Sequence, residues 1–154
     1  MDTRLCFNST DRLYEVRLGV RVLSSHSRKE DALLSQLAGE APQALALAQS
    51  LIAAHPELRE RALRAVALVA DGAVQADGNP GRYHVRSQQK GREDRYEIDL
   101  SASTCTCTDW QQRAPEVNGR RLCKHLLAAL FVRKLGSSAR KQPIRTEVMF
   151  HDRP

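Results

Sequence analysis

The first part of the chain alternates hydrophobic and polar positions. From Tyr14 to Val22 every second residue is apolar, and most of the residues between them are charged. A period of two is typical of a strand with one buried face. The apolar run Leu5–Phe7 precedes turn residues at positions 8–11, so it is a candidate partner strand. The pattern predicts a strand over residues 14–22 and a hairpin with the segment before it.

The next segment repeats its apolar positions at helical spacing. Leu33 and Leu37 mark a first helix, and Pro42 and Pro56 open a second and a third. A proline is tolerated there because its missing N–H would have no partner in a first helical turn anyway. Gly72 is placed to end the third helix. Nothing in these helices indicates chemistry, so they predict a small packing unit.

Turn residues fill positions 77–81, and the hydrophobic pattern changes across them. Behind them, alternation around Tyr83–Ser87 and Tyr96–Leu100 predicts two strands joined by a polar loop. An amphipathic helix follows later, which we expect to end near Leu135 with Gly136 as its stop. The predicted fold class is therefore α+β.

The predicted organisation has three parts. They are a strand-plus-helices unit over residues 1–77, a second strand-and-helix unit over 82–135, and a basic tail over 136–154. A chain of 154 residues has room for one compact domain or two small ones. With 27% charged and 42% hydrophobic residues, wholesale disorder is excluded.

The sequence also bears on location. No segment approaches the roughly 18 consecutive apolar residues of a membrane span, and the N-terminus lacks the pattern of a secretion signal. We therefore expect a cytoplasmic protein with no membrane partner. In a reducing compartment, the four cysteines are better suited to bind metal than to pair as disulfides.

Charge is distributed unevenly along the chain. Residues 1–80 hold 9 basic and 10 acidic side chains, whereas residues 81–154 hold 15 basic and 8 acidic ones. The positive excess lies entirely in the second half, which is where a polyanion such as nucleic acid would bind. A basic surface is also common on proteins that bind no polyanion, so charge alone leaves both interpretations open.

Two short pairs of soft or borderline metal ligands are separated by 15 residues: Cys105 and Cys107, then Cys123 and His125. Three thiolates and an imidazole suit tetrahedral zinc and match carboxylate-preferring metals poorly. Residues two apart on an extended chain point to one side, so the first pair can hold one ion together. Residues two apart on a helix lie about 200° around it, so Cys123 should precede a helix that has His125 in its first turn.

An ion held in this way would tie the strands to the helix as a β-β-α unit. The alternative is that three cysteines and a histidine are ordinary core residues that happen to cluster. Trp110 either packs over the site or stacks on a base, and Tyr83 and Tyr96 either pair across the sheet or form a stacking platform. His84 is a distant substitute for His125 as the fourth ligand.

The order Cys-x-Cys, spacer, Cys-x-His running into an apolar helix resembles the SWIM zinc-finger family. The resemblance covers roughly residues 83–135, including the strand around Tyr96, Trp110 and the segment Leu122–Ala128. It implies one structural zinc ion in a β-β-α module, of a kind found in small bacterial proteins, Mutator-type transposases and certain ATPases. It also implies binding to DNA or to protein. No family is identified for residues 1–80.

Catalysis is not expected. Protein fills all four zinc positions in this scheme, so no site remains for the water that a hydrolase or deaminase needs. The phosphate-loop, nucleophile-elbow and dinucleotide motifs of common enzymes do not occur in the sequence. We therefore expect no enzyme and no small-molecule substrate.

The best candidates for phosphate contacts are basic residues around and behind the second ligand pair: Arg120, Arg121, Lys124, Arg133 and Lys134. The leading function is a nucleic-acid-binding module, with DNA favoured over RNA by the resemblance alone. The alternative is an adaptor that docks onto a larger protein complex, in which case these charges are merely solvated.

Overall fold

The structure is a computed structural model, and it describes residues 3–8, 13–18, 21–26, 28–88 and 94–139. Its elements are, in chain order, β1 (Thr3–Asn8), β2 (Leu13–Leu18), β3 (Arg21–His26), α1 (Lys29–Glu40), α2 (Pro42–Ala54), η1 (Pro56–Leu58), α3 (Arg59–Ala70), β4 (Val74–Ala76), β5 (Arg82–Arg86), β6 (Arg95–Asp99), β7 (Thr104–Cys105), α4 (Thr108–Gln112), β8 (Glu116–Val117), β9 (Arg120–Arg121) and α5 (Lys124–Ala139). Helices and antiparallel strands occur together, which confirms the α+β class. Within the described ranges, none of the helices combines the length and the hydropathy needed to cross a membrane.

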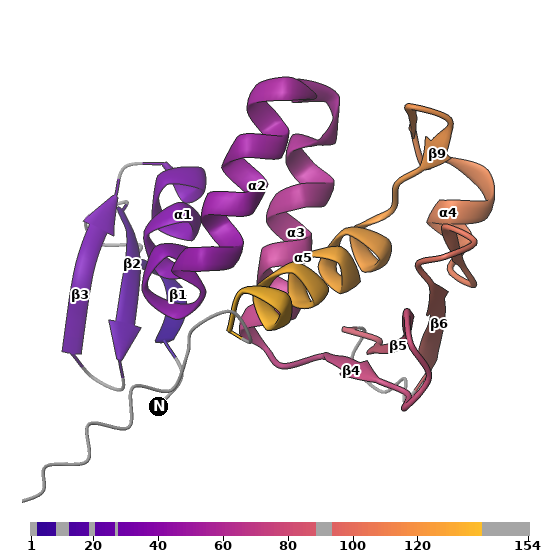
Figure 1. The fold of residues 1–154 in the computed structure, drawn as a ribbon. Coiled ribbons are helices and arrows are strands. Elements are labelled where there is room, and N and C mark those ends of the chain that lie inside the picture. Colours follow the sequence, from indigo (N-terminus) through magenta and orange to yellow (C-terminus); the bar gives the residue numbers. More distant parts are fainter. Residues whose placement is uncertain (1–2, 9–12, 19–20, 27, 89–93, 140–154) are drawn as a thin grey trace, which may run out of the picture.

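The N-terminal strands form an antiparallel sheet in the order β1-β2-β3, with α1 against it (Figure 1). Leu5 pairs with Val16 and Phe7 with Tyr14, so the predicted hairpin partner is confirmed. The prediction of one strand over residues 14–22 is wrong, because β2 ends at Leu18 and β3 runs back beside it. The alternation runs across the reversal as far as Val22 in β3, so the period alone does not reveal where the chain reverses.

The three predicted helices are confirmed as α1, α2 and α3. Pro42 opens α2, and Pro56 opens the 3-10 turn η1, which runs directly into α3. Gly72 adopts a positive φ of 62° just behind α3, as a residue that ends a helix commonly does. The buried residues of α2 and α3 include Ala44 and Ala62, whose small side chains let the two helices approach closely.

The second sheet is antiparallel with the order β4-β5-β6-β7. Positions 77–81 connect β4 to β5, so β4 precedes the predicted boundary and pairs with the first strand behind it. Val85 and Ile98 lie on the face that packs against α5, and both are almost completely buried. We refer to residues 74–139 as the finger. The division of the chain into three units stays a prediction.

The end of α5 differs from the prediction. The helix was expected to stop at Gly136, but it continues to Ala139. Ser137 donates a hydrogen bond of 2.9 Å from its hydroxyl to the carbonyl of Arg133, one helical turn back. Gly136 does not adopt a positive φ, so it does not act as a stop. Residues 136–139 of the predicted tail are thus helical, and residues 140–154 lie outside the described ranges.

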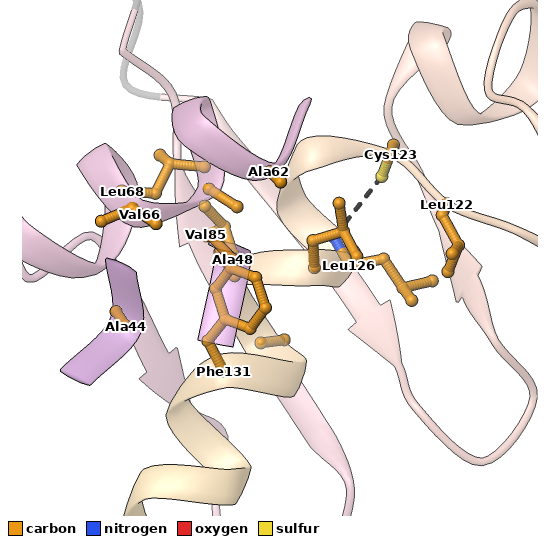
Figure 2. Packing of buried hydrophobic residues seen from close by; sticks show 14 of the residues in the cluster. Ala44, Ala48, Ala62, Val66, Leu68, Val85, Leu122, Cys123, Leu126 and Phe131 are labelled. Carbon is orange, nitrogen blue, oxygen red and sulfur yellow. Dashed lines mark hydrogen bonds between the residues drawn. The ribbon is translucent and has the colours of Figure 1, made fainter. Parts of the chain in front are cut away.

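A single hydrophobic cluster joins the helices to the finger. Helix α3 packs against α2 on one side and α5 on the other, and the cluster extends from Leu37 to Phe131. Figure 2 shows Ala62 of α3 near Leu126 of α5 in this core. The packing fixes α3 beside the start of α5, where the two halves of the predicted metal site meet.

Candidate metal centre and the cleft beside it

Four side chains from three elements converge at the start of α5. The possible ligand atoms of Cys105, Cys107, Cys123 and His125 all lie within 4.8 Å of one another. The Sγ atom of Cys105 is 4.0 Å from Nδ1 of His125. All four residues are buried. The structure therefore brings together the set that the sequence predicts, and we refer to it as the Cys3His cluster.

Local structure explains how each ligand reaches the cluster. Cys105 ends β7, and Cys107 is the N-cap of α4 with extended backbone. Cys123 directly precedes α5, and His125 is the second residue of that helix, as the spacing predicts. His84 lies outside the cluster, because it faces Asp77 at 3.9 Å on another part of the sheet. It does not substitute for His125.

Backbone N–H groups at two helix starts point at the sulfur atoms. The N–H of Trp110 donates to Sγ of Cys107 at 3.3 Å, and the N–H of Leu126 donates to Sγ of Cys123 at 3.5 Å (Figure 2). Such donors and the helix dipole stabilise thiolates. Hydrogen bonding among the thiols lowers the pKa of Cys107 and raises that of Cys105, because Cys107 is the acceptor. A metal ion would take the place of the shared protons.

An aromatic ring lies against the histidine of the cluster. The ring of Tyr96 lies 4.4 Å from that of His125, with an interplanar angle of 30°. Tyr96 pairs across the sheet with Val85, whereas Tyr83 pairs with Ile98, so the two tyrosines do not face each other directly. Tyr96 thus orients the imidazole. The half-buried Trp110 packs against the hydrophobic core from α4.

The donor set fits one structural zinc ion. Tetrahedral zinc with Zn–S bonds of roughly 2.3 Å and Zn–N bonds of 2.0–2.1 Å places its ligand atoms roughly 3.5–3.8 Å apart. The observed spread of at most 4.8 Å needs only a small contraction around an ion. Burial excludes solvent, and four protein donors complete the coordination. The arrangement suits an ion that holds β7, α4 and α5 together.

A buried Cys3His cluster that fastens a small antiparallel sheet to a helix defines a zinc-finger module. Residues 84–134 match the family model of the SWIM zinc finger, so this part of the chain is similar to the SWIM zinc fingers. The match covers about one third of the chain and leaves β1–β4 and helices α1–α3 outside it. No curated protein and no solved structure matches the chain.

The five predicted phosphate contacts do not form one patch. Arg120 and Arg121 are exposed on β9, and Arg121 donates from Nη1 to the carbonyl of Gln111 at 2.9 Å, which braces α4. Lys124 is half-buried at the start of α5, while Arg133 and Lys134 are exposed farther along it. Nine residues on a helix turn through about 900° and rise ~14 Å, so Lys124 and Arg133 lie on opposite sides.

Lys124 instead lines a cleft between α3 and the finger. The cleft has a volume of about 550 Å³, and His125 and Cys107 of the cluster form part of its wall. Its charged lining residues are Glu60, Arg61, Arg64, Asp109, Arg113 and Lys124. We refer to it as the α3 cleft. Sequence reasoning missed three of its four cations, because Arg61 and Arg64 resemble the solvated face of a packing helix and Arg113 stands apart from the ligands.

An ion pair closes one side of the cleft. Arg61 of α3 donates to both carboxylate oxygens of Asp109 in α4, at 2.8 and 3.0 Å. It also donates to the carbonyl of Arg113 at 3.3 Å. The bond to Asp109 raises the pKa of Arg61, so this guanidinium is always charged. The pair fixes α3 to the loop that carries Cys107.

Proposed function

We propose that the chain is a non-enzymatic nucleic-acid-binding module, in which zinc holds the finger and basic groups beside it contact phosphates. DNA is favoured over RNA because of the family resemblance. The observation that carries the proposal is the α3 cleft, where cations from two separate parts of the chain meet. The charge asymmetry of the sequence supports it, because the positive excess belongs to the half that forms the finger.

The charges of the cleft do not cancel. Arg61 is paired with Asp109, and Arg64 is paired with Glu60 one helical turn away. Arg113 and Lys124 have no carboxylate partner among the residues that the structure describes. With zinc bound, three thiolates and a neutral imidazole give the cluster in the cleft wall a formal charge of −1, so the cleft keeps a net charge of +1. Arg120, exposed on β9, adds a further cation near the same end of the finger (Figure 1). Such cations attract phosphate groups over a long range, and their binding releases counterions from the nucleic acid, which favours the complex.

A non-catalytic role is supported by the chemistry of the zinc site. Cys105, Cys107, Cys123 and His125 use up all four tetrahedral positions, so a bound ion has no open position for water. In the described part of the chain, no other group of histidines, cysteines and carboxylates comes together to hold a metal. Zinc then contributes folding energy, and the function lies on the surface around it.

A protein adaptor is the second candidate. Phe7 on the edge strand β1 is 57% exposed and is the one large hydrophobic side chain exposed in the described ranges. Its ring lies 5.0 Å from that of Tyr14 on the neighbouring strand. An apolar side chain on an open sheet edge favours contact with another protein. This surface belongs to a different region from the α3 cleft.

Salt dependence separates the two candidates. Binding to duplex DNA should weaken as salt rises, with a logarithmic slope of about −0.9 for each neutralised phosphate. Lys124→Ala should weaken binding to all sequences alike and flatten that slope by about one unit. Lys29→Ala on α1 is the matched control, because it removes an exposed lysine that does not line the cleft. Fluorescence anisotropy over a range of salt concentrations measures both.

Two results would count against the proposal. If the wild-type chain does not bind DNA at low salt, the proposed function is wrong. If Lys124→Ala binds DNA with the same salt dependence as wild type, the cleft is not the contact surface. A pull-down from lysate with and without nuclease tests the adaptor. A partner that remains after nuclease treatment and is lost in Phe7→Ser supports the second candidate.

A further inference from the structure

The size and the boundaries of the α3 cleft indicate which kind of phosphate group it can bind. At about 550 Å³ it is within the range of small-molecule pockets, roughly 300–1,000 Å³. The cleft is bounded by α3 on one side and by α4 and the start of α5 on the other. The internal phosphates of a duplex lie on a convex surface and meet a recess of this kind only at its opening. A phosphate at the end of a strand projects freely and can enter the recess.

The charge of the cleft favours the more negative of two phosphate groups. Two of its cations are compensated by carboxylates, and Arg113 and Lys124 together outweigh the formal charge of −1 on the zinc-loaded cluster in the wall. A phosphate monoester carries a charge of about −1.5 to −2 at neutral pH, whereas an internal diester carries a single negative charge. Thr108, the first residue of α4, also lines the cleft, and its side chain carries a hydroxyl that can donate a hydrogen bond.

The metal site holds these groups in place. Lys124 stands between the ligands Cys123 and His125, and Thr108 directly follows the ligand Cys107. The Arg61–Asp109 pair fixes α3 against this wall. The cations therefore sit on a rigid frame before any ligand arrives, which reduces the entropy lost on binding.

We propose that the α3 cleft binds the phosphate monoester of a nucleotide, carried by the end of a nucleic-acid strand. This inference rests on the proposed function and names the part of the nucleic acid that enters the cleft. Arg113 and Lys124 contact the phosphate, and Arg61 positions the wall without contacting it. Arg61 and Arg64, which line the cleft, lie outside residues 84–134, so the site extends beyond the part of the chain that matches the SWIM zinc finger.

The test compares two labelled single-stranded DNA oligonucleotides that differ in a 5′-phosphate or a 5′-hydroxyl. Fluorescence anisotropy with the zinc-loaded full chain should give about tenfold tighter binding to the phosphorylated strand, because only this strand forms charge-assisted hydrogen bonds from its terminal phosphate to the cations. Arg113→Gln should reduce this preference to about twofold or less. Arg82→Gln is the control, because Arg82 pairs with Asp99 on the opposite face of the sheet. It should lower both affinities equally and leave the preference intact.

Competition identifies the source of the phosphate. If adenosine 5′-monophosphate displaces the labelled phosphorylated strand as effectively as an unlabelled phosphorylated strand does, the cleft binds free nucleotides. If only phosphorylated strands displace it, the cleft binds strand ends. Either result supports a monoester site. Equal binding of the two strands by wild type, or full preference in Arg113→Gln, overturns the inference, as does tighter binding of a phosphoserine peptide. If the inference is overturned but the wild-type chain still binds DNA in a salt-sensitive way, the proposed function remains supported. If the wild-type chain binds no DNA, the proposed function is wrong as well.

Discussion

The helices α2 and α3 are stabilised in a different way from the finger that follows them in the sequence. The helices have 13 and 12 residues and bury alanine and leucine side chains against each other and against α5. Apart from the 16-residue helix α5, the finger consists of strands of two to five residues and the five-residue helix α4. Elements this short form few ladder or helical hydrogen bonds. The comparison teaches that metal coordination can replace element length.

The two regions still share one core. Leu68 of α3 and Leu126 of α5 belong to the same buried cluster, and Arg61 forms an ion pair with Asp109 across the contact. Stabilisation of the finger by metal therefore also supports the helices that pack on it. Removing each contribution in turn shows how far the regions depend on each other.

The largest effect is expected from removing a ligand. Cys123→Ala should abolish the cooperative melt of the finger, because zinc binding in such sites contributes on the order of 10–16 kcal/mol of apparent folding energy. Cys6→Ala is the matched control, since Cys6 is half-buried on β1 and lies outside the cluster. Thermal melts followed by far-UV circular dichroism measure both. A Cys123→Ala chain that melts like wild type would contradict the metal-held finger.

Removing packing from α3 should have the second largest effect. Leu68 is completely buried, so Leu68→Ala leaves a cavity and should lower the free energy of unfolding by about 2–5 kcal/mol. Leu47→Ala should cost less, because Leu47 on α2 is only partly buried. Denaturant titrations of zinc-loaded protein give both values. Equal losses in the two variants would show that α3 is not packed as described.

The ion pair between the regions should have a smaller effect. Asp109→Asn removes one partner of a partly buried, doubly bonded pair and should cost about 1 kcal/mol. Glu60→Gln breaks the exposed pair with Arg64 within one helix and should cost about 0.3 kcal/mol. A double-mutant cycle between Arg61 and Asp109 isolates their coupling. Zero coupling would mean that the pair does not join α3 to α4.

The smallest effect concerns the turn behind β6. The N–H groups of Ala102 and Ser101 donate to the carboxylate of Asp99, which lowers the pKa of Asp99. A lowered pKa means that this carboxylate stabilises the fold above the unfolded-state pKa and loses that contribution as pH falls through the folded-state pKa. NMR titration should place the Asp99 midpoint below that of an aspartate in a short unstructured peptide. Equal midpoints would show that the turn does not form in solution.

Much of this architecture was accessible from the sequence. Proline positions located the starts of α2 and η1, and the spacing of Cys123 and His125 placed one before α5 and the other in its first turn. These predictions succeeded because each rests on local geometry. The ligand set was predictable for the same reason, since two short chelating pairs need only one tertiary contact to meet.

Other features depend on contacts that no local pattern records. The reversal between β2 and β3 was missed because the alternation runs across it as far as Val22. The continuation of α5 past Gly136 was missed because a glycine ends a helix only where the chain turns away. The α3 cleft was missed because Arg64 and Lys124 are 60 positions apart and meet only through the packing of α3 on α5.

The zinc content of the full chain tests the central claim most directly. Inductively coupled plasma mass spectrometry on protein purified without added metal should give one zinc ion per chain. Cys105, Cys107, Cys123 and His125 would then hold the ion that closes the finger. A chain with native circular dichroism and no bound metal would contradict the account.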